Sequence, residues 1–99
     1  MKINIQSVKF NADQKLVNHI ESKLSKLERF FDHITGVDVF LKLDEQSSTV
    51  KDKVVSIRCR VPGTQLFAEE TSKTFEVSVD QAMQSLSRQV KKYKAKKRA

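Results

Sequence analysis

Apolar and polar residues alternate over four short segments of the chain, and this period of two predicts β-strands. The four segments are residues 2–6, 36–44, 55–61 and, less regularly, 65–72. Successive side chains of a strand point to opposite faces, so alternation indicates a sheet with one packed face and one wet face. Pro62-Gly63 favours a tight turn before the last strand, and the polar stretch Asp44–Asp52 predicts a loop before the third.

Two longer segments repeat their apolar residues every three or four positions, which predicts amphipathic helices. The first begins at Asn11, a candidate N-cap with Gln14 three residues on, and Gly36 is the candidate stop. Its apolar stripe is Val17, Ile20, Leu24, Leu27 and Phe31. The second begins after Thr74, a candidate N-cap, and its stripe is Phe75, Val79, Ala82, Met83, Leu86 and Val90.

The elements follow the order β-α-β-β-β-α within one domain of 99 residues. Because each strand has one wet face, both helices belong on the other face. The predicted fold is therefore an α+β two-layer sandwich, a four-stranded sheet with both helices on one face. Residues 94–99 are predicted as a basic, frayed tail.

The composition excludes several classes of protein. The longest apolar runs have three residues, whereas a membrane-spanning helix needs about 20, so no membrane partner is expected. The start, Met1 to Ile5, lacks the apolar stretch of a secretory signal. Cys59 is the single cysteine and falls on the apolar face of its strand, which is typical of a core residue in a cytoplasmic protein.

Residues that could carry catalysis or bind a metal are sparse. His19 and His33 lie fourteen residues apart with no acidic residue at metal-ligand spacing, and Glu69 and Glu70 project to opposite faces of a strand. Two glycines cannot form a phosphate-binding loop. We therefore expect no enzymatic activity, no metal, no cofactor and no small-molecule substrate.

The positive charge is concentrated at one end of the chain. The formal net charge is +7, yet residues 1–87 contain twelve basic and twelve acidic residues, which cancel. The last twelve residues contain seven basic residues and no acidic one. Such asymmetry favours a polyanionic partner, of which nucleic acid is the commonest.

Basic residues also lie on the outer faces of both predicted helices. On the first helix Lys15, Lys26 and Arg29 lie opposite the apolar stripe and Lys23 flanks it. On the second helix the outward cations are Arg88, Lys91 and Lys92. Basic residues on the outer face of a helix are most often only exposed to water, but here the acidic residues of the first helix gather along a different edge of that helix. This predicts contact with nucleic-acid phosphates, and because no aromatic residue but Tyr93 faces outward, it predicts no platform for stacked bases.

Two motifs resemble the ribosome hibernation-promoting factor family, which includes the ribosome-associated inhibitor proteins. One is Lys23-Leu24-Ser25-Lys26-Leu27-Glu28-Arg29-Phe30-Phe31-Asp32 in the first helix. The other is Phe75-Glu76-Val77-Ser78-Val79-Asp80, followed by Arg88-Gln89-Val90-Lys91-Lys92-Tyr93-Lys94. The order and spacing of the elements agree along essentially the whole chain, although the family often has Asp-Met-Tyr where this chain has Thr74-Phe75-Glu76. The chain ends soon after the second helix, as in the short forms of the family.

The resemblance implies a protein that binds the small ribosomal subunit and the whole ribosome in the mRNA and tRNA channel. It would inhibit translation in starved or stationary-phase cells by steric occlusion, and we expect a monomer when it is free. By matching motif positions, the candidate rRNA-binding residues are Lys23, Lys26, Arg29, Arg88, Lys91 and Lys92.

Two other functions remain open at this point. One is a generic double-stranded RNA-binding or ribosome assembly module that uses the same basic face on free RNA. The other is a protein-interaction domain, in which Arg58 and Arg60 on the wet sheet face meet an acidic partner.

Overall fold

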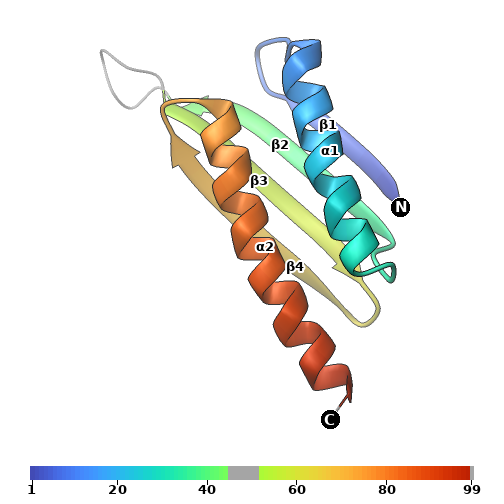
Figure 1. The fold of residues 1–99 in the computed structure, drawn as a ribbon. Helices are drawn as coiled ribbons and strands as arrows, with labels where there is room; N and C mark the ends of the chain where they lie inside the picture. Colours follow the sequence, from blue (N-terminus) through green and yellow to red (C-terminus); the bar gives the residue numbers. More distant parts are fainter. Residues whose placement is uncertain (45–51, 99) are drawn as a thin grey trace.

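The computed structural model describes residues 1–44 and 52–98, and it contains the predicted elements in the predicted order (Figure 1). The elements are β1 Lys2–Ser7, α1 Gln14–Phe30, β2 Gly36–Asp44, β3 Asp52–Val61, β4 Thr64–Ser72 and α2 Phe75–Arg98. Residues 45–51 of the predicted loop lie outside the described residues. None of the helices in the described ranges is long and apolar enough to cross a membrane.

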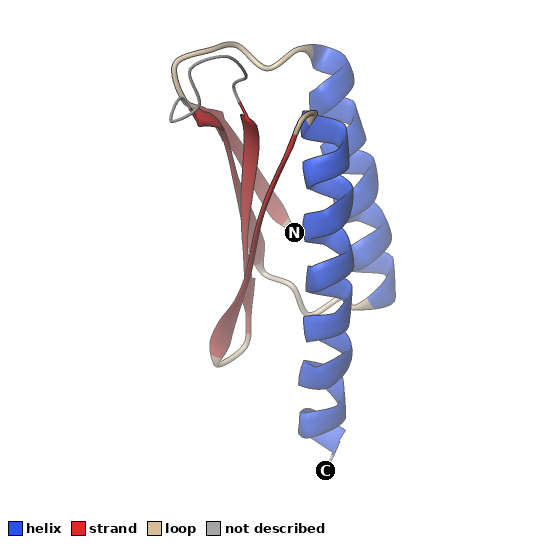
Figure 2. Ribbon diagram, turned by 90° about the vertical axis from the view of Figure 1, so that its left-hand side faces the viewer, coloured by secondary structure: helices blue, strands red, loops and turns tan. Residues whose placement is uncertain are grey.

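The four strands form one sheet in the order β1-β2-β3-β4. β1 pairs with β2 in parallel, and the β2–β3 and β3–β4 pairs are antiparallel. A parallel pair of consecutive strands needs a long crossover, and α1 supplies it. Both helices lie on the same side of the sheet, as Figure 2 shows, so the predicted two-layer α+β fold is confirmed.

The core lies between the sheet and the two helices. Three cross-strand pairs of β2 and β3 form its centre, and all six side chains are fully buried: Val37 with Cys59, Val39 with Ile57, and Leu41 with Val55. The helices cover these pairs with Ile20 and Leu24 of α1 and with Val79, Leu86 and Val90 of α2. Each such burial stabilises the fold by about 1.5–3 kcal/mol, so these contacts fix the helices on the sheet.

The predicted ends of the first helix are wrong. Asp13, in place of Asn11, is the N-cap, and its carboxylate accepts a hydrogen bond from Leu16 N at 2.8 Å. Before the cap, Phe10 stacks on Phe75 of α2 with 5.2 Å between the ring centroids. At the other end Phe31 adopts an extended conformation and buries its ring, so the helix ends before Gly36 is reached.

Gly36 begins β2 and has a different role there. The Arg60 guanidinium lies over it and forms an ion pair with Asp38. A Cβ atom at position 36 would overlap that guanidinium, so the missing side chain leaves room for the Arg60–Asp38 pair.

The second helix begins as predicted, and it continues further than predicted. Thr74 Oγ1 accepts a hydrogen bond from Val77 N at 3.2 Å, which confirms the cap. Residues 94–98 of the predicted tail are part of α2, which extends as far as Arg98 and projects past the end of the sheet (Figure 2). Tyr93 packs edge-on against Phe31 and donates a hydrogen bond to Pro62 O at 2.5 Å. This contact and the helix-forming Lys and Ala residues keep the segment helical.

Candidate nucleic-acid interface

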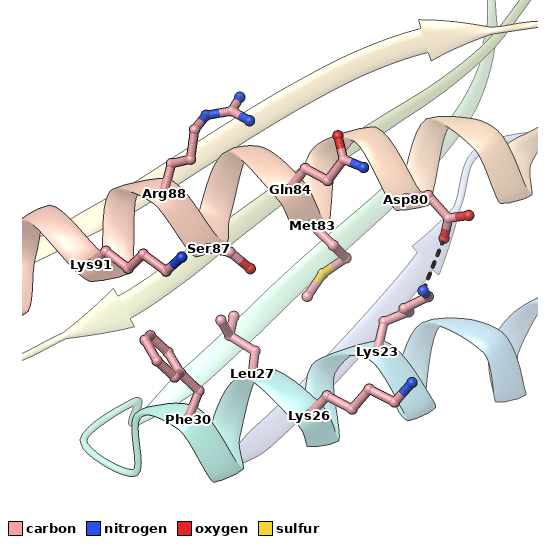
Figure 3. A pocket seen from close by; sticks show the side chains of 10 residues that line it. All are labelled: Lys23, Lys26, Leu27, Phe30, Asp80, Met83, Gln84, Ser87, Arg88 and Lys91. Carbon is pink, nitrogen blue, oxygen red and sulfur yellow. Dashed lines mark ion pairs between the residues drawn. The ribbon is translucent and has the colours of Figure 1, made fainter.

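An open groove of about 650 Å³ runs between the two helices on the face that points away from the sheet (Figure 3). The helical period brings its residues together, because positions three or four apart share one side of a helix. On α1 these are Lys23, Lys26, Leu27 and Phe30, and on α2 they are Asp80, Met83, Gln84, Ser87, Arg88 and Lys91. The groove therefore unites the two motifs that carried the resemblance.

The groove has an apolar floor and cationic walls. Leu27 and Met83 are 4% and 7% exposed and join the core below, whereas Lys26, Arg88 and Lys91 are exposed above it. Within the described part of the chain, these three cations form no ion pair. A cleft lined by one sign of charge over low-dielectric walls concentrates the electric field, so this groove attracts anions.

One end of the groove is partly neutralised. Asp80 Oδ1 lies 2.8 Å from His19 Nε2 and 3.7 Å from Lys23 Nζ, and the second of these contacts is drawn in Figure 3. These contacts link α1 with α2. They also place a carboxylate beside Lys23, so the more cationic end of the groove is the end with Arg88 and Lys91, where Phe30 also lies (Figure 3).

The structure places only some of the six predicted rRNA-binding residues in the groove. Lys23, Lys26, Arg88 and Lys91 line the groove, whereas Arg29 is exposed on α1 outside the groove lining. Lys92 lies on another side of α2, where it lines a second hollow of about 520 Å³ with Lys96 and residues of β4. The outer faces of the helices thus carry two cationic areas, and the groove between the helices holds four of the six residues.

Phe30 is a groove residue that the sequence analysis missed. The prediction that no aromatic residue but Tyr93 faces outward is wrong, because Phe30 is 45% exposed and lines the groove, whereas Tyr93 is half-buried against Phe31. A signal was present in the sequence. Phe30 lies four residues after Lys26 and seven after Lys23, so the helical period places it on the edge that these cations share.

Among the described residues, the other candidate groups form no second site. Cys59 is fully buried, and burial raises the pKa of its thiol to about 11 against a smaller lowering by nearby Arg60, so the prediction of a core residue is confirmed. In the ranges 1–44 and 52–98 no three His, Cys, Asp or Glu side chains cluster as a metal site would. On the open sheet face Arg60 pairs with Asp38, which leaves Arg58 as the more available arginine there.

The structure is thus an α+β sandwich with a cationic groove between its two helices, and such a groove can attract anions. The chain is a member of the family described as Sigma 54 modulation protein / S30EA ribosomal protein, which matches residues 3–98. Together with relatives named as ribosome hibernation factors, this match confirms the predicted resemblance to that family.

Similar proteins agree in name and in fold. The Ribosome hibernation promotion factor of Bacillus subtilis is 32% identical over 98 residues, which cover 97% of this chain and 50% of that protein. The Ribosome hibernation promoting factor of Pseudomonas putida is 27% identical over 99 residues, which cover the whole of this chain and 92% of that one. A ribosomal subunit interface protein from Coxiella burnetii has the same fold, with a TM-score of 0.85 at 24% identity over 96% of this chain and 99% of its own.

Proposed function

We propose that this chain is a ribosome hibernation factor that binds the small ribosomal subunit in the channel for mRNA and tRNA. Its family, and relatives named as ribosome hibernation factors, support the link with the ribosome. The observation that carries the proposal is the cationic groove, where Lys26, Arg88 and Lys91 are exposed and meet no acidic partner among the described residues. Phosphates of rRNA are the natural partners of such a surface.

The proposed mechanism is occlusion, in which no covalent bond is made or broken. The helical face binds rRNA phosphates, and the folded domain, which measures 49 × 23 × 19 Å, fills space that mRNA and tRNA need. If about five phosphates are neutralised, log affinity falls with log salt concentration with a slope of about −3.5 to −4.5. The free protein is a monomer in this proposal, and it acts in starved or stationary-phase cells.

A pair of matched charge reversals tests which face binds. Arg88→Glu with Lys91→Glu alters the groove, and Lys42→Glu with Arg58→Glu makes the same change in charge on the open sheet face. We expect the groove variant to lose more than about tenfold in affinity for small subunits at physiological salt, because phosphate contacts become repulsive. The sheet variant should bind as the unchanged protein does, and circular dichroism should show both variants folded.

Two results would contradict this assignment. A larger loss in the sheet variant would indicate a partner on the open face, as in a protein-interaction domain. Equal binding of ribosomes and of free RNA duplex by the unchanged protein would indicate a generic double-stranded RNA-binding module.

A further inference from the structure

Phe30 is placed where a purely structural phenylalanine would not be expected. It is the last residue of α1, and 45% of it is exposed, whereas the adjacent Phe31 is buried in the core. A single exposed apolar residue needs no explanation by itself. The surroundings of Phe30 supply one, because its ring lines the same groove as Lys26 and Lys91 (Figure 3).

A contact from α2 holds the Phe30 ring in place. Lys94 Nζ lies 4.3 Å from the ring centroid and donates a hydrogen bond to Phe30 O at 3.3 Å. An ammonium group over an aromatic face is attracted by the ring quadrupole. Lys94 lies over one face of the ring and does not line the groove, whereas Phe30 lines the groove and remains 45% exposed, which leaves the other ring face as the one that a ligand could contact.

The groove thus combines an oriented aromatic ring with cations at the spacing of a helical turn. Lys26 lies one turn before Phe30 on α1, and Arg88 and Lys91 lie on the opposite wall. A volume of about 650 Å³ falls within the range of about 300–1,000 Å³ that small ligands occupy in proteins. Ring and cations together match a nucleotide, whose base has an aromatic face and whose phosphate is an anion.

We propose that the groove binds an unpaired RNA nucleotide, with its base stacked on Phe30 and its flanking phosphates at Lys26, Arg88 and Lys91. This inference rests on the proposed function, since both place RNA on the helical face, and it adds which kind of RNA element the groove selects. The bases of a duplex are stacked on one another inside the helix and cannot reach a side-chain ring. The groove therefore prefers single-stranded RNA or an extruded base to a regular duplex.

The test uses a short single-stranded RNA with one central fluorescent adenine analogue, whose emission falls when the base stacks. We expect the unchanged protein and Phe30→Tyr to quench the emission. Phe30→Leu should abolish the quenching and weaken binding by about 5- to 150-fold, the range expected for one stacked base. Phe67→Leu is the matched control, because Phe67 is 49% exposed on the other face of the sheet, and it should behave as the unchanged protein does.

The outcomes separate this inference from the proposed function. Equal quenching and affinity in Phe30→Leu and the unchanged protein would overturn the stacked nucleotide. If Phe30→Leu also binds small subunits with full affinity while Arg88→Glu with Lys91→Glu does not, the inference fails and the proposed function stands. If the unchanged protein quenches the RNA but does not bind ribosomes, the proposed function fails and the nucleotide site stands.

Discussion

Asp80 sets how much of the groove's positive charge is available to a partner. Its carboxylate meets His19 and Lys23, and because these groups are partly exposed to water, the contacts add little to stability. Their effect is on the local field. Lys23 shares its charge with a carboxylate, whereas Lys91 has no such neighbour among the described residues, so two lysines with the same predicted role differ in their surroundings.

This difference predicts that two alanine substitutions lower the affinity for small subunits by unequal amounts. Lys91→Ala should weaken binding to small subunits more than Lys23→Ala, and it should reduce the salt slope by about 0.7–0.9, the contribution of one phosphate contact. Lys23→Ala should change the slope less. Binding curves measured over a range of salt concentrations give both slopes, and equal changes in the two variants would contradict the role assigned to Asp80.

Cys59 gives a prediction about pH. Its folded-state pKa is raised to about 11 from an ordinary value of 9.0, so the folded protein keeps the thiol protonated where the unfolded chain already loses its proton. The contribution of this thiol to stability is therefore complete below pH 9.0 and is lost as the pH rises towards 11. At about pH 8 the native protein should react with iodoacetamide far more slowly than the protein in urea, as mass spectrometry can follow. Comparable rates would show that the thiol is accessible.

At the scale of single elements, α2 protects the exposed edge of the sheet. The Gln89 side chain accepts a hydrogen bond from Phe67 N at 3.2 Å and donates one to Phe67 O at 2.7 Å. It thus occupies backbone groups on β4 that would otherwise be open to pairing with another strand. Unpaired edges favour association of sheets from different molecules, so Gln89 guards against self-association.

Gln89→Ala should therefore have two effects. It should lower the free energy of unfolding by about 1–2 kcal/mol, because two hydrogen bonds at a partly exposed site are lost, and it should increase self-association. Urea denaturation and analytical ultracentrifugation measure these effects. Gln81→Ala is the control, because Gln81 is exposed on the same helix. The assignment would be wrong if both variants were as stable and as monomeric as the unchanged protein.

The element bounds show what the sequence could predict. Alternation and helical period located every strand and helix, because burial of one face is a local pattern. The ends of α1 were harder to predict. The start depends on which of two nearby capping side chains bonds to the helix, and the end depends on Phe31, which turns into the core. Asp13 caps the helix in place of the predicted Asn11.

The candidate site was predictable only in part for a similar reason. A helical wheel gives the direction of a side chain around its own helix, but it does not give the neighbouring element on that side. Lys91 and Lys92 both point outward on the wheel, yet α1 lies beside Lys91 and β4 lies beside Lys92. Phe30 was missed because its neighbour Phe31 already completed the apolar stripe.

At the scale of the whole molecule, the two faces differ in charge. The helical face carries the groove cations and the basic residues along α2. On the open sheet face Arg60 pairs with Asp38, and Glu69 accepts a hydrogen bond from Ser56 at 2.6 Å. A molecule with one basic face and one mixed face approaches a polyanion in one orientation, as the proposed binding inside the mRNA and tRNA channel would require.

Co-sedimentation with ribosomes measures the proposed binding to the small subunit itself. The purified protein is pelleted with separated subunits and whole ribosomes, at low and physiological salt, with free RNA duplex or with mRNA and tRNA as competitors. We expect stoichiometric pelleting with the small subunit and the whole ribosome, which resists the duplex and is displaced by mRNA and tRNA. Pelleting that the duplex removes as readily, or that mRNA and tRNA leave unchanged, would contradict the proposed binding.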